Sequence, residues 1–139
     1  MSISIKLEWE YAGAGDESLE FSRVLYAYLH PKSNEILYIG KADFSTVRKR
    51  LVGAHKMAIF KAIVKGRKLS VLHMIVGWPN LPEGRRLSSE LLADIESLLI
   101  MEVQPPYNRQ SRQSRIARLG LVVQCAGDWP LATKKFIDL

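Results

Sequence analysis

The sequence contains one cysteine, Cys125, and no apolar run of the about 18 residues that a membrane-spanning helix requires. A single cysteine excludes an internal disulfide and provides no zinc-ligand spacing. No histidine lies near it in sequence, so we interpret Cys125 as a small apolar filler rather than a nucleophile. The N-terminus also lacks the basic start and apolar segment of a signal peptide. These absences predict a protein of a reducing cytoplasm, without a membrane partner.

Acidic residues are scarce in the middle of the chain. Residues 41–68 contain nine lysines and arginines against Asp43 alone, a balance of +8, whereas residues 1–20 have a balance of −4. Concentrated positive charge is typical of a surface that binds a polyanion such as nucleic acid. A solvated helix face explains such a charge run equally well.

The length of 139 residues suits a single domain, and the apolar fraction of 47% is that of an ordinary globular protein. Alternation of apolar and polar residues from Ile3 to Tyr11 predicts a half-buried strand. Its outer face is acidic, and we expect the segment 1–20 to be an extension packed on a sheet edge.

A hairpin is predicted over residues 24–39. Residues 24–29 alternate as a strand, residues 30–34 are turn material, and residues 36–39 form a second strand that Gly40 ends. Antiparallel pairing of these strands predicts that three phenols crowd one face, those of Tyr26, Tyr28 and Tyr38. Lys41 follows directly, so phenols and cations are expected together, as a phosphate-handling site requires.

Helical spacing of apolar residues predicts a basic helix from Ser45 or Thr46 to Lys65, with a break at Gly53 and an end at Gly66. The apolar run of residues 69–78 predicts a well-buried third strand. His73 within that strand is interpreted as a hydrogen-bonded core residue.

A strongly amphipathic helix is predicted from Ser88 or Ser89 to Val103. Glu96 lies at the edge of its apolar stripe, where a carboxylate is costly to bury without a cation or metal partner. An edge carboxylate that reaches water or an arginine is the simpler alternative. Glu102 projects even closer to the centre of the stripe, but it lies where the helix ends and is free to turn outward.

Two separated motifs resemble the GIY-YIG nucleases. The first motif has two parts, Val24-Leu25-Tyr26 and Tyr38-Ile39-Gly40-Lys41-Ala42. The part that begins at Tyr38 is similar to the corresponding sequence of the UvrC repair nucleases. The other motif begins at Glu96 and closes with Pro105-Pro106-Tyr107-Asn108, in the family's order and without a gap. Together they span about residues 24–108.

The resemblance implies an α+β fold. We expect a small, mainly antiparallel, three-stranded central sheet flanked by helices, with the extra N-terminal strand and a basic C-terminal extension over residues 109–139. Within this single domain, the resemblance assigns structural roles to Gly40 and to Asn108, whose side chain is expected to bond to the backbone and close the helix end against the sheet.

The resemblance also implies catalytic roles for six residues. Glu96 is expected to hold one divalent ion, Mg²⁺ or Mn²⁺, because a hard cation suits a carboxylate, phosphate oxygens and water. Tyr26 acts as general base or orients the attacking water, Tyr38 assists or contacts the phosphate, and Lys41 is expected to favour the phenolate. Arg50 clamps the scissile phosphate. His55 resembles a family histidine at an offset of one residue, and a partly exposed helix histidine without a catalytic role is the alternative.

The spacing leaves the phosphate clamp open between two arginines. Arg48 fits the direct count from Tyr38, whereas Arg50 fits the flanking Val-Arg-Lys-Arg-Leu pattern and is preferred. Further contacts to the nucleic-acid backbone are expected from cationic residues, namely Arg48, Lys49, Lys56, Arg109 and Arg112. The arginines that recur every third residue from Arg109 suit either a phosphate backbone or a solvated connector.

The expected function is therefore a divalent-metal-dependent endonuclease that hydrolyses DNA, with RNA as an open alternative. A catalytically silent nucleic-acid-binding module of the same fold is the competing hypothesis. A chain of this size resembles members that combine cleavage and recognition in one domain. Cutting both strands needs two active sites, so a homodimer is also predicted.

Overall fold

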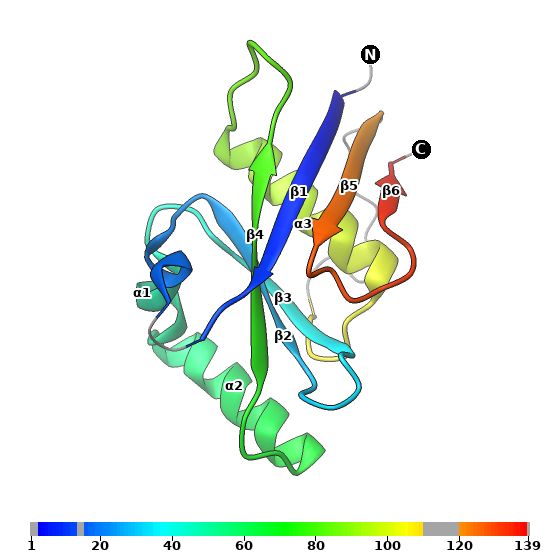
Figure 1. Cartoon of the computed structure of the whole chain (residues 1–139). Coiled ribbons are helices and arrows are strands. Elements are labelled where there is room, and N and C mark those ends of the chain that lie inside the picture. Colours follow the sequence, from blue (N-terminus) through cyan, green and yellow to red (C-terminus); the bar gives the residue numbers. More distant parts are fainter. Residues whose placement is uncertain (1–2, 14–15, 110–119, 139) are drawn as a thin grey trace.

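The computed structural model describes residues 3–13, 16–109 and 120–138, and they form an α+β fold. Its centre is a six-stranded mixed sheet that is strongly curled into a half-barrel, and three helices accompany it (Figure 1). The strand order is β3-β2-β4-β1-β5-β6. The α+β class is confirmed, but the sheet is larger than the predicted three central strands with one added strand.

The predicted hairpin is formed by β2 (Val24–Leu29) and β3 (Ile36–Ala42), which pair antiparallel with Tyr26 opposite Gly40 and Tyr28 opposite Tyr38. Gly40 therefore lies inside β3, and the prediction that it ends the strand was wrong. On its other side β2 pairs antiparallel with β4 (His73–Asn80).

The N-terminal strand β1 (Ile3–Tyr11) lies inside the sheet and not on its edge. It pairs antiparallel with β4 on one side and parallel with β5 (Leu121–Gly127) on the other. A short strand, β6 (Lys135–Ile137), completes the sheet. Alternation in a sequence shows that a strand has one buried face but not how many neighbours it has, which explains the wrong placement of β1.

The predicted basic helix is divided where Gly53 indicated a break. The short helix α1 (Val47–Leu51) is capped by Thr46, whose hydroxyl accepts a hydrogen bond from the Lys49 amide at 3.2 Å. Gly53 then begins α2 (Ala54–Arg67), which ends with Lys68 in the left-handed conformation. Gly66 does not end the helix. A Cβ there would lie 2.4 Å from the Tyr107 hydroxyl, so a larger residue would displace the end of the Tyr107 side chain.

The second predicted helix, α3 (Ser89–Val103), begins as expected, because the Ser88 hydroxyl accepts a hydrogen bond from the Leu91 amide at 3.0 Å. Its apolar stripe is buried, and Glu102 is exposed, as anticipated for the end of the helix. A short 3₁₀ helix, η1 (Glu17–Glu20), precedes β2.

The helices divide between the two faces of the sheet (Figure 1). Along β2, alternate side chains belong to different clusters: Leu25, Ala27 and Leu29 pack with α3, whereas the side chains of Tyr26 and Tyr28 belong to the cluster of α1 and α2. The predicted core residue His73 is exposed and packs edge-on against the Tyr11 ring at 6.2 Å, so that interpretation was wrong. Cys125 is buried in the core, as predicted.

Candidate functional site

Three tyrosines gather on the hairpin face that α1 and α2 cover. The rings of Tyr26, Tyr28 and Tyr38 lie with centroids 6.2–6.3 Å apart, and all three are almost completely buried. Strand alternation and the opposite positions of Tyr28 and Tyr38 bring them together, as the sequence predicted.

The Tyr26 ring lies directly over Gly40. A Cβ on Gly40 would be 2.6 Å from both Cζ and Oη of Tyr26, closer than atoms approach without displacement. The Tyr26 hydroxyl is buried, and it has no partner of full hydrogen-bond geometry among the described residues. A buried polar group left in this condition is costly, which marks the position as one where a further ligand or water would be favourable.

Burial keeps these phenols protonated. It raises the pKa of Tyr38 and that of Tyr28 to about 12 and moves the pKa of Tyr26 higher still, although the nearby Arg50 opposes the shift for Tyr26. The expectation that Lys41 would favour the phenolate was therefore wrong. Desolvation of the charged form outweighs the effect of neighbouring cations.

Lys41 instead faces Glu96. Its Nζ lies 3.7 Å from Oε1 of Glu96, a carboxylate that is only 4% exposed. Burial raises the pKa of Glu96, and the positive charges of Lys41, Lys56 and Arg50 oppose that shift. The carboxylate thus has the cationic surroundings that its place at the edge of the apolar stripe required.

Lys56, which the sequence predicts to contact nucleic acid, lies against Tyr38. Its Nζ donates a hydrogen bond to the Tyr38 hydroxyl and lies 5.0 Å from the centre of the Tyr38 ring. Burial, followed by the charge of Arg50, lowers the pKa of Lys56. The helical spacing carried a signal, because Ile59 and Ile63 of α2 pack with the three tyrosines and Lys56 precedes them by three and seven residues.

The two candidate clamp arginines lie in different surroundings. Arg48 forms an ion pair with Glu20 of η1 at 2.5 Å, whereas the charge of Arg50 acts on Tyr26, Tyr38, Lys56 and Glu96. These electrostatic interactions therefore favour Arg50. Lys49 lies between them on the short helix and is exposed.

Asn108 joins the segment after α3 to the edge of β3. Its side-chain oxygen accepts a hydrogen bond from the Ile39 amide and its side-chain nitrogen donates to the Ile39 carbonyl, each at 2.8 Å. The adjacent Tyr107 amide donates to the Leu37 carbonyl at 3.0 Å. The Asn108 side chain thus occupies the exposed edge of β3 as a neighbouring strand would.

His55 lies outside the tyrosine cluster. It is exposed, and with Lys56, Asn108 and Arg109 it lines a groove of about 630 Å³ between α2 and residues 106–109, which also reaches Tyr38. Arg112 belongs to the segment 110–119, which lies outside the described residues. The structure therefore brings together Tyr26, Tyr38, Lys41, Arg50, Lys56 and Glu96, and leaves His55 at the rim.

Among the described residues, no group of three or more His, Cys, Asp or Glu side chains could hold a metal ion. Glu96 nevertheless fits a divalent cation that is held by few protein ligands. Mg²⁺ usually takes one or two carboxylates and completes its shell with substrate phosphate and water. Glu96 is a nearly buried carboxylate beside the tyrosine cluster, which is the kind of ligand that such an ion takes.

Comparison of the chain with protein-family models, with curated proteins and with solved structures gives no match. In the part of the chain that the structure describes, no helix is both long and apolar enough to cross a bilayer.

Proposed function

We propose that this protein is a divalent-metal-dependent endonuclease of the GIY-YIG type that hydrolyses phosphodiester bonds in DNA. The observation that carries the proposal is the convergence of two buried phenols, three cations and one buried carboxylate at the edge strand β3. Glu96 of α3 contacts Lys41, and Lys56 of α2 contacts Tyr38, so the two helical layers meet at this strand. Titratable groups with shifted pKa values gather in this way at catalytic sites.

Phosphodiester hydrolysis needs an activated water, a group that accepts its proton, and positive charge near the phosphate oxygens. Water attacks the phosphorus, its proton passes to the accepting group, and the bond to the leaving oxygen breaks. Glu96 would hold Mg²⁺ or Mn²⁺, and such an ion, when bound, polarises the phosphoryl oxygen. Arg50 binds the non-bridging oxygens with its planar fork.

The raised pKa of Tyr26 supports one of the two roles proposed for it. A phenol that stays protonated at neutral pH is a poor general base, so Tyr26 orients the water through its hydroxyl. The proton is taken by the Tyr38–Lys56 pair. In the neutral form of Lys56, Nζ accepts the Tyr38 hydroxyl proton while Oη of Tyr38 accepts a proton from the water. Burial lowers the pKa of Lys56 and so favours the neutral form.

The positive charge of residues 41–68 supports a nucleic-acid substrate. This region has a balance of +8 and contributes Lys41, Arg50 and Lys56 to the site. DNA is the substrate we propose, with RNA as the alternative to be tested beside it. Cleavage of both strands by a single-domain enzyme requires a second copy of the chain, so we propose a homodimer on the substrate, acting in the cytoplasm.

The test is incubation of the purified protein with supercoiled plasmid and Mg²⁺, beside a chelator control and the Glu96→Ala variant. We expect nicked or linear plasmid only with the wild type and the metal. Glu102→Ala is the matched control, because Glu102 is an exposed carboxylate on the same helix. Equal cleavage by the Glu96→Ala variant would contradict the proposal.

The second candidate is the catalytically silent nucleic-acid-binding module. It is favoured by the pairing of Glu96 with Lys41, which already supplies the carboxylate with a positive charge. A salt-sensitive gel shift without cleavage of plasmid, branched DNA or RNA would support it. The absence of both binding and cleavage would contradict both proposed functions.

A further inference from the structure

A groove beside the tyrosine cluster extends from Tyr38 and Lys56 to residues that the proposed cleavage does not use. Its volume of about 630 Å³ lies within the range of about 300–1,000 Å³ that is typical of small-molecule sites. Helix α2 contributes Ala58, Ile59 and Ala62, and the segment after α3 contributes Pro106 and Tyr107. Short apolar side chains on one side and flat rings on the other leave room for a flat apolar group.

The lining of the groove becomes polar and cationic toward the tyrosine cluster. Lys56 and Tyr38 belong to both, so the end of the groove reaches the pair that we propose to accept the proton. His55 and Arg109 add polar and cationic groups to the lining. An occupant that suits both parts has a flat apolar body and an anionic group, and a nucleotide has these two properties.

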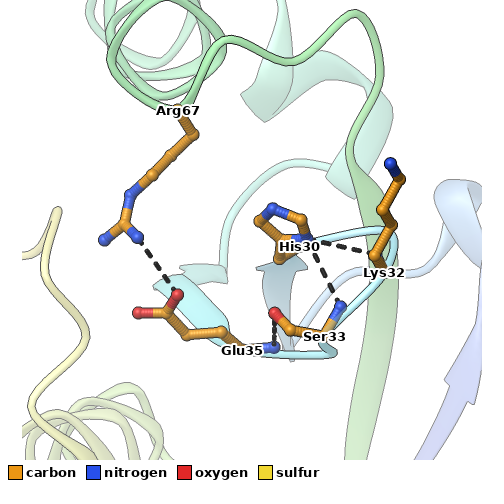
Figure 2. Close-up of polar contacts among 5 residues, drawn as sticks. All are labelled: His30, Lys32, Ser33, Glu35 and Arg67. Carbon is orange, nitrogen blue, oxygen red and sulfur yellow. Dashed lines mark hydrogen bonds and ion pairs between the residues drawn. The ribbon is translucent and has the colours of Figure 1, made fainter.

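Tyr107 is held in place by a chain of contacts that starts at the hairpin turn. The guanidinium of Arg67 lies 5.7 Å from the centre of the Tyr107 ring, and its Nη1 bonds Oε1 of Glu35 at 3.2 Å. Figure 2 shows Arg67 reaching down from the end of α2 to Glu35 on the turn. A ring fixed in this way loses little conformational entropy when a ligand packs beside it.

The turn that carries Glu35 is itself ordered by side chains. Nδ1 of His30 accepts hydrogen bonds from the amides of Lys32 and Ser33 at 3.1 and 3.4 Å, and the Ser33 hydroxyl accepts one from the Glu35 amide at 3.3 Å (Figure 2). The position of Glu35, and through it that of Arg67, is thus set by local turn chemistry.

We propose that this groove binds one unpaired nucleotide of the substrate strand, next to the phosphate at the cleavage site. The inference rests on the proposed function, because it assumes a nucleic-acid substrate at the tyrosine cluster. A base stacked inside an uninterrupted duplex cannot enter a groove, whereas an unpaired base leaves the stack at lower cost. The substrate class is therefore nucleic acid with an unpaired nucleotide, such as a bulge, rather than regular duplex.

The experiment measures binding of the full chain, in chelator, to a fluorescein-labelled duplex and to the same duplex with one bulged nucleotide. Contact of an unpaired base with an aromatic groove is expected to tighten binding about tenfold. Ala62→Leu, and separately Ala58→Leu, fill the groove from exposed positions of α2 and should reduce the ratio of the two affinities to about one. Lys61→Leu is the control, because it places the same side chain on an exposed position of α2 outside the groove.

Loss of the preference in both groove variants, with Lys61→Leu retaining it, would support the inference. The affinity ratio is unaffected by a uniform loss of phosphate attraction, so the charge removed in the control does not disturb it. No preference in the wild type, or a preference that survives both groove variants, would overturn the inference, as would absence of all nucleic-acid binding. Because chelator prevents metal-dependent cleavage, a failure of the nuclease proposal in the plasmid test would not be confused with these results.

Discussion

The Tyr26 ring rests on the backbone of Gly40, the residue opposite it across the hairpin. An added Cβ would lie 2.6 Å from Cζ and Oη of the ring. The glycine is thus required by packing and not by a turn, since its strand continues to Ala42. This relationship links the first motif of the sequence to the position of a phenol in the site.

Gly40→Ala is expected to destabilise the protein, because the buried Tyr26 ring must move or the strands must separate. Overpacking of this kind costs about 1–3 kcal/mol. Urea denaturation followed by circular dichroism measures the change. Gly53→Ala is the control, since its Cβ would meet only the Arg50 carbonyl at 3.6 Å, an ordinary contact. A Gly40→Ala protein as stable as the wild type would contradict the packing argument.

Glu96 is expected to bind a divalent ion even without substrate. Saturating Mg²⁺ should raise the stability of the wild type by roughly 1–3 kcal/mol and leave Glu96→Gln unchanged, because a neutral amide is a weaker ligand for a hard cation. Thermal unfolding with and without Mg²⁺ is the measurement. Glu102→Gln, on the exposed part of the same helix, should respond as the wild type does. An equal response of Glu96→Gln would place the ion elsewhere.

Arg50 and not Arg48 is expected to bind the scissile phosphate. Arg50→Ala should lower the cleavage rate by about 100-fold or more, as removal of one transition-state donor does. Arg48→Ala should affect cleavage far less, because Arg48 is ion-paired with Glu20. Plasmid nicking rates for both variants decide the matter, and Arg50→Lys tests whether charge without the fork suffices. A larger loss in Arg48→Ala would reverse the assignment.

The tyrosine cluster predicts a loss of stability at alkaline pH. Tyr28 has a pKa of about 12 in the folded protein because of burial, against an ordinary value of 10.0. Between these values the unfolded chain releases the proton first and the folded chain retains it, so the free energy of unfolding falls as pH rises from 10 to 12. This one group accounts for roughly 1–3 kcal/mol of that fall.

Tyr28→Phe removes the phenol and with it this pH-dependent part of the stability. The free energy of unfolding of the variant, measured by urea denaturation, should therefore fall less steeply between pH 9 and 11.5 than that of the wild type. Tyr11→Phe is the matched control, since Tyr11 is 45% exposed and lies outside the cluster. An unchanged slope for Tyr28→Phe would contradict the assigned burial effect.

Local patterns predicted the parts of the fold that depend on neighbours in sequence. The hairpin placed Tyr26, Tyr28 and Tyr38 on one face, Ser88 marked the start of α3, and Gly53 marked the break before α2. Such features follow from alternation, helix capping and backbone freedom, which act over a few residues.

The parts that were not predicted depend on distant pairing. The position of β1 is set by β5, where Ile3 lies opposite Leu121, and no short-range pattern reports that contact. β6 was missed because it is only three residues long. His73 lies at the first position of β4 and therefore stays exposed, although its neighbours in sequence are apolar.

Lys56 is expected to be the residue whose loss affects the pH dependence of cleavage most, because it is the half-buried cation bonded to the Tyr38 hydroxyl. Burial lowers its pKa, so the neutral, proton-accepting form increases with pH, and the wild-type kcat/KM should rise with pH up to that pKa. Lys56→Arg keeps the positive charge but cannot lose its proton in this range.

In Lys56→Arg, kcat/KM should therefore no longer rise with pH, and at alkaline pH it should be about 100-fold lower than in the wild type. This factor is the lower end of what a general base contributes. His55→Ala is the matched control, since His55 precedes Lys56 on α2 but is exposed at the rim of the groove. If His55→Ala abolished the pH dependence and Lys56→Arg retained it, the proton would pass to the histidine. The resemblance that singled out His55 would then identify the proton acceptor better than the contacts of the folded site do.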